Sequence, residues 1–232
     1  PRDKKWDGNR SFKKFLKVFK KMKFKKIIFD FDGVILKSHK VKTQAFYDLF
    51  LRYGDNIALK AKNYHIKKIG ISRYIKFKFI LKKYTRLKIN NKLLEDLSIR
   101  FTKICFNKII RLKISKKLLI FIRKNKTNCK FYISTGTPQN EIEKILTIKK
   151  IKNLFTNIYG SPLKKIDHIN QIRKGTKHVL YIGDSMEDYL SSKKAKISFL
   201  LKEHNENKKD FKSIKVKKIK NYSNIKKIID TF

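Results

Sequence analysis

Two acidic loops follow apolar segments that have the character of buried strands. Asp30 and Asp32 end the apolar run in KKIIFDFDGVIL, and Asp184 and Asp188 follow the run HVLYI. Open α/β sheets bind ligands at the carboxyl ends of their parallel strands, so these side chains could meet at one edge of a sheet. One carboxylate there can attack as a nucleophile, and another can work as general acid and base.

Acidic loops on neighbouring strands would repel each other unless a cation lay between them. A few carboxylate oxygens with room for water favour Mg²⁺. Each loop taken alone also has a simpler interpretation. The DFDG segment could be a turn capped by its aspartates, and Asp188 could stabilise the first turn of a helix.

Two further segments carry groups that suit a phosphate. Ser134, Thr135 and Gly136 follow a short apolar stretch, and a hydroxyl with free backbone N–H groups before a helix can bind a phosphate oxygen. An ordinary helix N-cap explains the same residues. The segment SPLKK offers Lys164 and Lys165, and in a chain this rich in lysine neither is informative alone.

The elements that must position these loops alternate between strands and helices, which predicts a parallel sheet with right-handed crossovers. Strands are expected within 25–36 and at about 129–134, 156–159, 178–184 and 196–201. Helices are expected at about 115–125, 138–147, 163–174, 186–195 and 222–230. An all-helical stretch follows the first strand, with helical patterns at about 40–53, 55–67, 72–84 and 90–111.

The sequence therefore predicts an α/β fold with a Rossmann-like parallel sheet core and an inserted all-helical cap. The core would comprise residues 22–38 and 112–232, and the cap residues 39–111. Residues 1–21 form a basic extension in which Phe12, Phe15, Leu16 and Phe19 recur at helical spacing. This pattern fits a helix on a membrane surface or an extension outside the domain, and we favour the second.

The charge of the chain has two interpretations. Its 232 residues carry 61 basic and 18 acidic side chains, a formal charge of +43. Such a charge is typical of proteins that bind nucleic acid or anionic surfaces. Only nine of the basic residues are Arg, the side chain that reads base edges and clamps phosphates, and the lysines are spread over the whole chain. We favour a compositional bias over selected affinity for nucleic acid.

Several classes of protein are excluded by composition. No apolar run approaches the length of a membrane-spanning helix. The first apolar cluster is broken by lysines, unlike a signal peptide. The two cysteines, Cys105 and Cys129, have neither a CxxC nor a zinc-like spacing, which favours a reduced, cytoplasmic protein.

The order and spacing of the four segments resemble the haloacid dehalogenase-like superfamily of phosphotransferases. DFDGV is similar to its first motif, IST to its second, SPLKK to its third and GDSMED to its fourth, over about residues 22–202. The inserted helices look like the cap of its phosphoglycolate phosphatase and β-phosphoglucomutase-like branch. The resemblance implies that Asp30 attacks phosphorus and that Asp32 protonates the leaving oxygen and then activates water.

The resemblance also implies a metal site and a phosphate site. Mg²⁺ would be held by Asp30, the backbone carbonyl of Asp32 and Asp184, with Asp188 in support. Among the phosphate-binding candidates, Thr135 with Gly136 is preferred over Ser134, and Lys165 over Lys164.

A cap segment and one departure complete the resemblance. Gly70-Ile71-Ser72-Arg73 is similar to a substrate-contacting segment of the mutase-like members, so Arg73 could pair with an anionic group of the substrate, with His65 and Lys76 as weaker neighbours. Ser72 could equally be a helix N-cap beside a solvated arginine. Lys37 stands where many relatives have an acidic residue.

We expect a Mg²⁺-dependent phosphatase that hydrolyses a small phosphomonoester, such as a sugar phosphate or a phosphoglycolate-like compound, through an aspartyl-phosphate. The alternatives are a phosphomutase on the same scaffold and a lysine-rich nucleic-acid-binding protein. The partner of the enzyme would be a small anionic phosphorylated metabolite. The sequence leaves the oligomeric state open.

Overall fold

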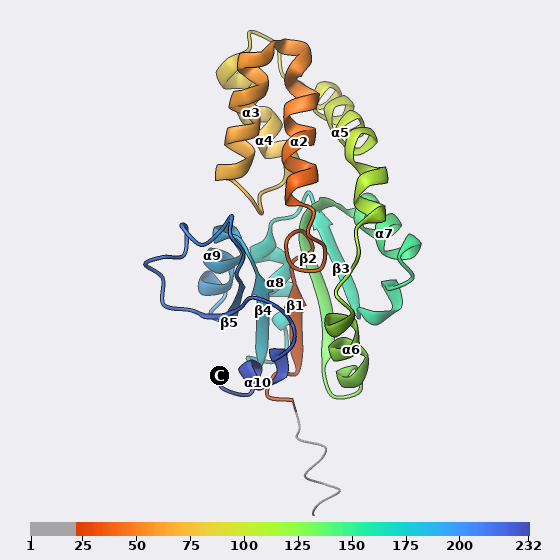
Figure 1. Ribbon diagram of the computed structural model, residues 1–232, viewed down its shortest axis with the longest axis vertical. Helices are drawn as coiled ribbons and strands as arrows, with labels where there is room; N and C mark the ends of the chain where they lie inside the picture. Colours follow the sequence, from red (N-terminus) through yellow and green to blue (C-terminus); the bar gives the residue numbers. More distant parts are fainter. Residues whose placement is uncertain (1–21) are drawn as a thin grey trace, which may run out of the picture.

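The computed structural model describes residues 22–232, and the basic extension over 1–21 lies outside the described residues (Figure 1). Six parallel strands form one sheet in the order β3-β2-β1-β4-β5-β6. The strands are β1 (Lys26–Phe29), β2 (Lys130–Pro138), β3 (Asn157–Ser161), β4 (Val179–Gly183), β5 (Ser198–Lys202) and β6 (Lys217–Ile219). The predicted parallel sheet is confirmed, with the first strand at its centre.

Helices cover both faces of the sheet, because its strands are apolar on both sides. On one face Ile27 and Phe29 pack with α6 (Lys116–Asn125), α7 (Gln139–Ile148) and α10 (Ile225–Ile229). On the other face Ile28 and Tyr181 pack with α8 (Lys165–Arg173) and α9 (Met186–Lys194). The alternation of these neighbours along the strands follows the two-residue period of a β-strand.

The inserted cap consists of four helices that stand over the carboxyl ends of the strands, at the top of Figure 1. They are α2 (His39–Phe50), α3 (Asp55–Lys67), α4 (Arg73–Tyr84) and α5 (Asn91–Arg111). A short 3₁₀ turn, Leu51–Tyr53, follows α2, and another, Lys152–Leu154, precedes β3. The predicted fold class, a parallel sheet with an all-helical insert, is confirmed. The division at residues 39 and 111 stays our proposed boundary.

Two elements differ from the expectation. The second strand continues past Ser134 to Pro138, with an irregular register toward β3, so the Thr135-Gly136-Thr137 segment is extended. The tail contains a strand, β6, that was not predicted, because two of its three residues are exposed lysines and only Ile219 is buried. A pattern of one apolar residue among lysines gives no strand signal.

None of the helices within 22–232 has both the length and the apolar character required to cross a membrane. Cys105 and Cys129 are both buried and free.

Aromatic packing holds the cap together, and Phe77 is its centre. Its ring is fully buried and lies 5.5 Å from that of Phe46, 5.9 Å from that of Phe50 and 6.0 Å from that of Phe101, measured between centroids. Rings at these separations add specific contacts to the burial of apolar area.

Phe77→Ala is expected to lower the free energy of unfolding by about 3–5 kcal/mol, because it removes a large buried side chain and leaves a cavity. Urea denaturation measures the change. The exposed Phe79 on the same helix provides the control, and an equal loss in Phe79→Ala would contradict the assignment of Phe77 to the cap core.

Candidate active site

The predicted acidic residues are brought together at the carboxyl end of the sheet. Phe29 pairs with Ile182 in the register of β1 and β4, so Asp30 lies beside the residues that follow β4. Asp30, Asp184 and Asp188 are almost completely buried, and each places one carboxylate oxygen within 4.8 Å of the others. Three buried carboxylates this close carry more negative charge than an apolar interior tolerates without a cation.

One lysine neutralises part of this charge. Lys165 is buried at the start of α8 and donates to Asp30 Oδ2 at 2.9 Å and to Asp188 Oδ1 at 2.6 Å, whereas Lys164 is exposed. Burial and the neighbouring Asp188 raise the pKa of Asp30 well above its ordinary value, against the opposing effect of Lys165. Burial lowers the pKa of Lys165, but Asp188 and Asp30 outweigh it and raise that pKa. The geometry supports Lys165 over Lys164 as the phosphate-steadying lysine.

Asp188 is fixed by the local sequence after β4. Ser185 is the N-cap of α9, and its hydroxyl and the carboxylate of Asp188 form a capping box with the backbone. Asp188 Oδ2 accepts from the backbone N–H groups of Asp184 and Ser185, at 3.2 and 3.0 Å. Gly183 allows this arrangement, because a Cβ there would lie 2.5 Å from Cβ of Asp188.

Asp184 has one oxygen occupied and one free. Its Oδ2 contacts Nε2 of His39 at 2.6 Å and Nε2 of His204 at 2.8 Å. Its Oδ1 is buried and has no hydrogen-bond partner among the described residues. Burial raises the pKa of Asp184, but the two imidazoles outweigh it and lower that pKa below its ordinary value. An ionised, unpartnered buried oxygen beside two other carboxylates fits a ligand of a divalent cation.

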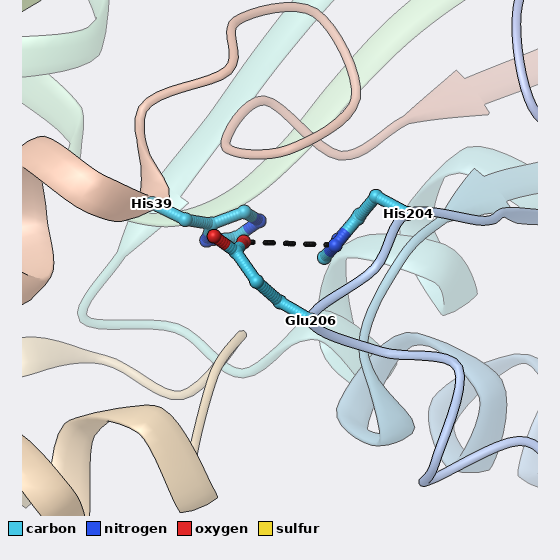
Figure 2. A group of neighbouring side chains, drawn as sticks. All are labelled: His39, His204 and Glu206. Atoms are coloured by element: carbon cyan, nitrogen blue, oxygen red, sulfur yellow. Dashed lines mark ion pairs between the residues drawn. The ribbon is translucent and has the colours of Figure 1, made fainter.

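The two histidines were not anticipated from the sequence. Figure 2 shows His39, at the start of α2, and His204 and Glu206, from the loop after β5, pointing toward one another. Glu206 lies 3.6 Å from Nδ1 of His204. The three residues place potential metal-ligating atoms within 4.8 Å of each other. Because both Nε2 atoms already contact Asp184, we assign the pair to orienting that carboxylate.

Gly33 makes room for this contact. It has a φ of +81°, and a Cβ built on it would lie 1.9 Å from Asp184 Oδ2 and 2.0 Å from His39 Nε2. Only glycine combines this backbone conformation with the absence of a side chain. The Gly of the DFDG motif is therefore required by the neighbouring carboxylate as well as by its own turn.

Asp32 accepts hydrogen bonds from Ser38, from Lys42 of the cap and from Thr137 of β2. Its Oδ1 accepts from the Ser38 hydroxyl at 2.5 Å, and its Oδ2 accepts from Lys42 Nζ at 2.5 Å and from Thr137 Oγ1 at 3.0 Å. Burial raises the pKa of Asp32, but Lys42 and Ser38 outweigh it and hold that pKa well below its ordinary value. Lys42 was missed because one lysine among so many gives no signal in the sequence.

Ser134 and Thr135 of β2 have different surroundings. Ser134 Oγ lies 3.0 Å from Nδ1 of His168, away from the acidic cluster. Thr135 and Gly136 line a cavity of about 290 Å³ together with Lys165. This placement supports Thr135 over Ser134 as the residue that meets a phosphate oxygen.

The cap closes a second, smaller cavity over the acidic residues. It measures about 40 Å³, enough for a few waters, and its lining includes Asp30, Asp32 and Arg73. The cap and core backbones nearly touch, since a Cβ on Gly136 would lie 3.1 Å from the carbonyl oxygen of Gly70. A substrate larger than a few atoms therefore requires the cap to move.

Arg73 faces this cavity but already has a partner. Its guanidinium is buried and forms a two-point ion pair with Glu141, in which Nη2 lies 2.8 Å from Oε1 and Nη1 lies 2.8 Å from Oε2. Nη1 also donates to Thr102 Oγ1 at 2.8 Å. The Ser72 side chain makes no cap hydrogen bond to α4. Contact between Arg73 and a substrate stays a prediction.

The comparison with known families covers the same segments. The model for haloacid dehalogenase-like hydrolases matches residues 27–202, from the first strand through β5. The chain belongs to the haloacid dehalogenase-like hydrolase family. This confirms the resemblance drawn from the four motifs. Enzymes of this family typically use a divalent metal, and this hydrolase has the acidic cluster to hold one. No curated protein matches the sequence.

Solved structures similar to this hydrolase include three of interest. A predicted phosphoglycolate phosphatase from Haemophilus somnus is 17% identical, with a TM-score of 0.68, over 89% of this chain and 98% of its own. The hydrolase YfnB from Bacillus subtilis, bound to magnesium, is 18% identical, with a TM-score of 0.60, over 89% and 99%. CbbY from Rhodobacter sphaeroides, in complex with xylulose-1,5-bisphosphate, is 11% identical, with a TM-score of 0.68, over 86% and 95%. At these identities the likeness shows the fold, and nothing in it supports the nucleic-acid alternative.

His168, the partner of Ser134, is expected to make the free energy of unfolding depend on pH. Burial and the nearby Lys165 lower the pKa of His168 from 6.5 to about 4. Between those two values the unfolded chain binds a proton that the folded protein does not bind. The free energy of unfolding is therefore expected to fall as pH drops from 6.5 to 4, by up to about 3 kcal/mol from this residue.

His168→Gln should remove this contribution. Urea unfolding at a series of pH values is expected to give a shallower decline for the variant than for the native protein. Parallel curves for the two proteins between pH 6.5 and 4 would mean that His168 is not the group responsible.

Proposed function

We propose that this hydrolase is a Mg²⁺-dependent phosphatase that cleaves a small phosphomonoester through an aspartyl-phosphate on Asp30. The observation that carries the proposal is the cluster of Asp30, Asp184 and Asp188, in which Lys165 pairs with Asp30 and Asp188 and one Asp184 oxygen is unpartnered. The phosphoglycolate phosphatase-like and magnesium-bound neighbours have the same fold.

The first half-reaction transfers the phosphoryl group to the protein. A carboxylate oxygen of Asp30 attacks phosphorus, the ester P–O bond breaks, and the leaving oxygen takes a proton from Asp32. Lys165 and the Thr135-Gly136 segment would stabilise the charge on the equatorial oxygens. Entry of an anionic phosphate next to Asp32 raises the pKa of that carboxyl and so favours the protonated form that this step needs.

The second half-reaction returns Asp30 to its starting state. Asp32, held as a carboxylate by Lys42 and Ser38, takes a proton from a water that attacks phosphorus. The bond between phosphorus and Asp30 breaks, and inorganic phosphate leaves. The cap excludes other water while the intermediate exists.

Mg²⁺ would be held by Asp30, the backbone carbonyl of Asp32 and Asp184, with Asp188 in support. Bound there, the ion would offset the charge of the carboxylates and of the transferring phosphoryl group. Its preference for oxygen ligands matches the donor set. The substrate is proposed to be a small anionic phosphorylated metabolite, which the strongly basic protein attracts. The cytoplasmic location stays a prediction.

Asp30→Asn should lower the turnover of p-nitrophenyl phosphate and of any phosphomonoester that the native protein accepts by at least about a thousandfold, because the amide cannot form the intermediate. The measurement is phosphate release from a panel of metabolite phosphates, with Mg²⁺ and with chelator. Asp210→Asn is the matched control, since Asp210 is exposed.

Undiminished turnover in Asp30→Asn would rule out the nucleophile. Isomer formation with a bisphosphate primer is followed in the same reactions, and isomerisation without phosphate release would replace hydrolysis by the phosphomutase alternative.

His204→Ala is expected to raise the Mg²⁺ concentration for half-maximal activity by about 10–100-fold, because Asp184 loses one of the two side chains that orient it. A titration of activity against Mg²⁺ measures the shift. His178→Ala serves as control, since His178 is exposed and precedes β4 at the other end of the strand. Equal Mg²⁺ requirements for the two variants would show that His204 does not position a metal ligand.

A further inference from the structure

A buried lysine of the cap faces the acidic residues of the core without a counter-ion. Lys76, on α4, is 3% exposed and lines the 40 Å³ cavity together with Asp30 and Asp32. The hydrogen-bond partner of its Nζ is Nδ1 of His65, at 3.0 Å. It forms no ion pair with any of the residues from 22 to 232.

The other cations around the cavity are each matched by a carboxylate. Lys42 pairs with Asp32, and Arg73 pairs with Glu141 at two points. Lys165, just beyond the cavity, pairs with Asp30. Lys76 is therefore the cavity cation that these carboxylates leave unmatched.

His65 cannot supply the missing charge. Burial and Lys76 lower the pKa of His65 well below its ordinary value, so its imidazole is neutral and accepts at Nδ1. Its Nε2 is buried without a partner. Phe46, whose ring centroid lies 5.4 Å from Lys76 Nζ, gives a cation–π contact that offsets only part of the cost of burying an ammonium group. The pKa of Lys76 is lowered to about 7 by burial and by Lys42, as expected where negative charge is missing.

We propose that Lys76 and His65 form a subsite for a second anionic group of the substrate, a carboxylate or a second phosphate. The inference rests on the proposed function and narrows its substrate to a small phosphomonoester with two anionic ends. The transferring phosphoryl group lies on the core side, with Asp30 and Lys165. The second group meets Lys76 on the cap side.

This arrangement links recognition to closure of the cap. Lys76 belongs to the cap and the nucleophile to the core, so a substrate with an anion at each end contacts both. Because Asp30 and Lys76 line the same small cavity, a short frame of a few atoms is expected between the two anions. A substrate with a single phosphate would leave Lys76 buried and unpaired when the cap closes.

The test compares three probes with the same two-carbon frame. They are phosphoglycolate, with a carboxylate at the far end, 1,2-ethanediol bisphosphate, with a phosphate, and 2-hydroxyethyl phosphate, with a neutral hydroxyl. The native protein is expected to favour at least one anionic probe over the neutral one by about tenfold or more in kcat/KM. The anionic probe with the larger kcat/KM identifies the second group as carboxylate or phosphate.

Lys76→Met should bring that ratio close to one, because it removes the charge and keeps the length of the side chain. Lys76→Arg should restore part of the preference. Lys78→Met is the matched control, since Lys78 is exposed on the same helix, and it should keep the native ratio. An unchanged ratio in Lys76→Met, or equal losses for the anionic and neutral probes, would overturn the subsite and leave Lys76 a structural residue.

Binding distinguishes failure of the subsite from failure of the proposed function. If the native protein releases phosphate neither from these probes nor from p-nitrophenyl phosphate and the metabolite panel, the phosphatase assignment fails. Titration calorimetry with phosphoglycolate and 2-hydroxyethyl phosphate then still tests the subsite. Lys76→Met must lose the preference for phosphoglycolate that Lys78→Met retains, and if both variants retain it the subsite is overturned.

Discussion

The interaction on which this site depends is the sharing of one ammonium group, that of Lys165, between Asp30 and Asp188. Three carboxylates and one lysine leave a net negative charge in the interior. Burial and that excess raise the pKa of Asp30, and one buried oxygen of Asp184 has no partner among the described residues. The strand register, the capping box at Ser185 and the two histidines hold these charges close in spite of their repulsion. A bound cation would balance the negative charge that the protein alone leaves in this site.

The cap depends on the same edge of the sheet. Gly70 of the cap lies so near the core that a Cβ on it would be 2.2 Å from the Ser185 hydroxyl, and Gly136 lies against the same cap loop. Lys42 of α2 reaches down to Asp32. The carboxylate that we propose as general acid and base is therefore paired with a cap residue, and this ion pair couples closure of the cap to the protonation state of Asp32.

The sequence could predict the parts of the site that are local. Asp30, Asp32 and Asp184 follow recognisable strands, and parallel pairing brings strand ends together regardless of detail. His204 could not be found in this way, because its contact with Asp184 depends on how the loop after β5 folds back, and β6 holds that region with one buried apolar residue. The choice of Thr135 over Ser134 rested on the neighbouring glycine, and the structure adds the reason that His168 takes the Ser134 hydroxyl.

Because the chain is so rich in lysine, the lysines of the candidate site cannot be recognised from the sequence. A compositional bias toward lysine places additional lysines on the surface, where a charged side chain costs little free energy. In the interior a lysine is disfavoured, because burying an unpaired ammonium group is costly. Lys42, Lys76 and Lys165 are nevertheless buried around one cavity and its edge. Lys42 and Lys165 form ion pairs with carboxylates of the protein, whereas Lys76 forms none with the described residues. Most of the lysines of this chain give no sign of a specific role. Lys76 differs because it is buried without a carboxylate partner, and we relate it to an anion that the substrate would supply.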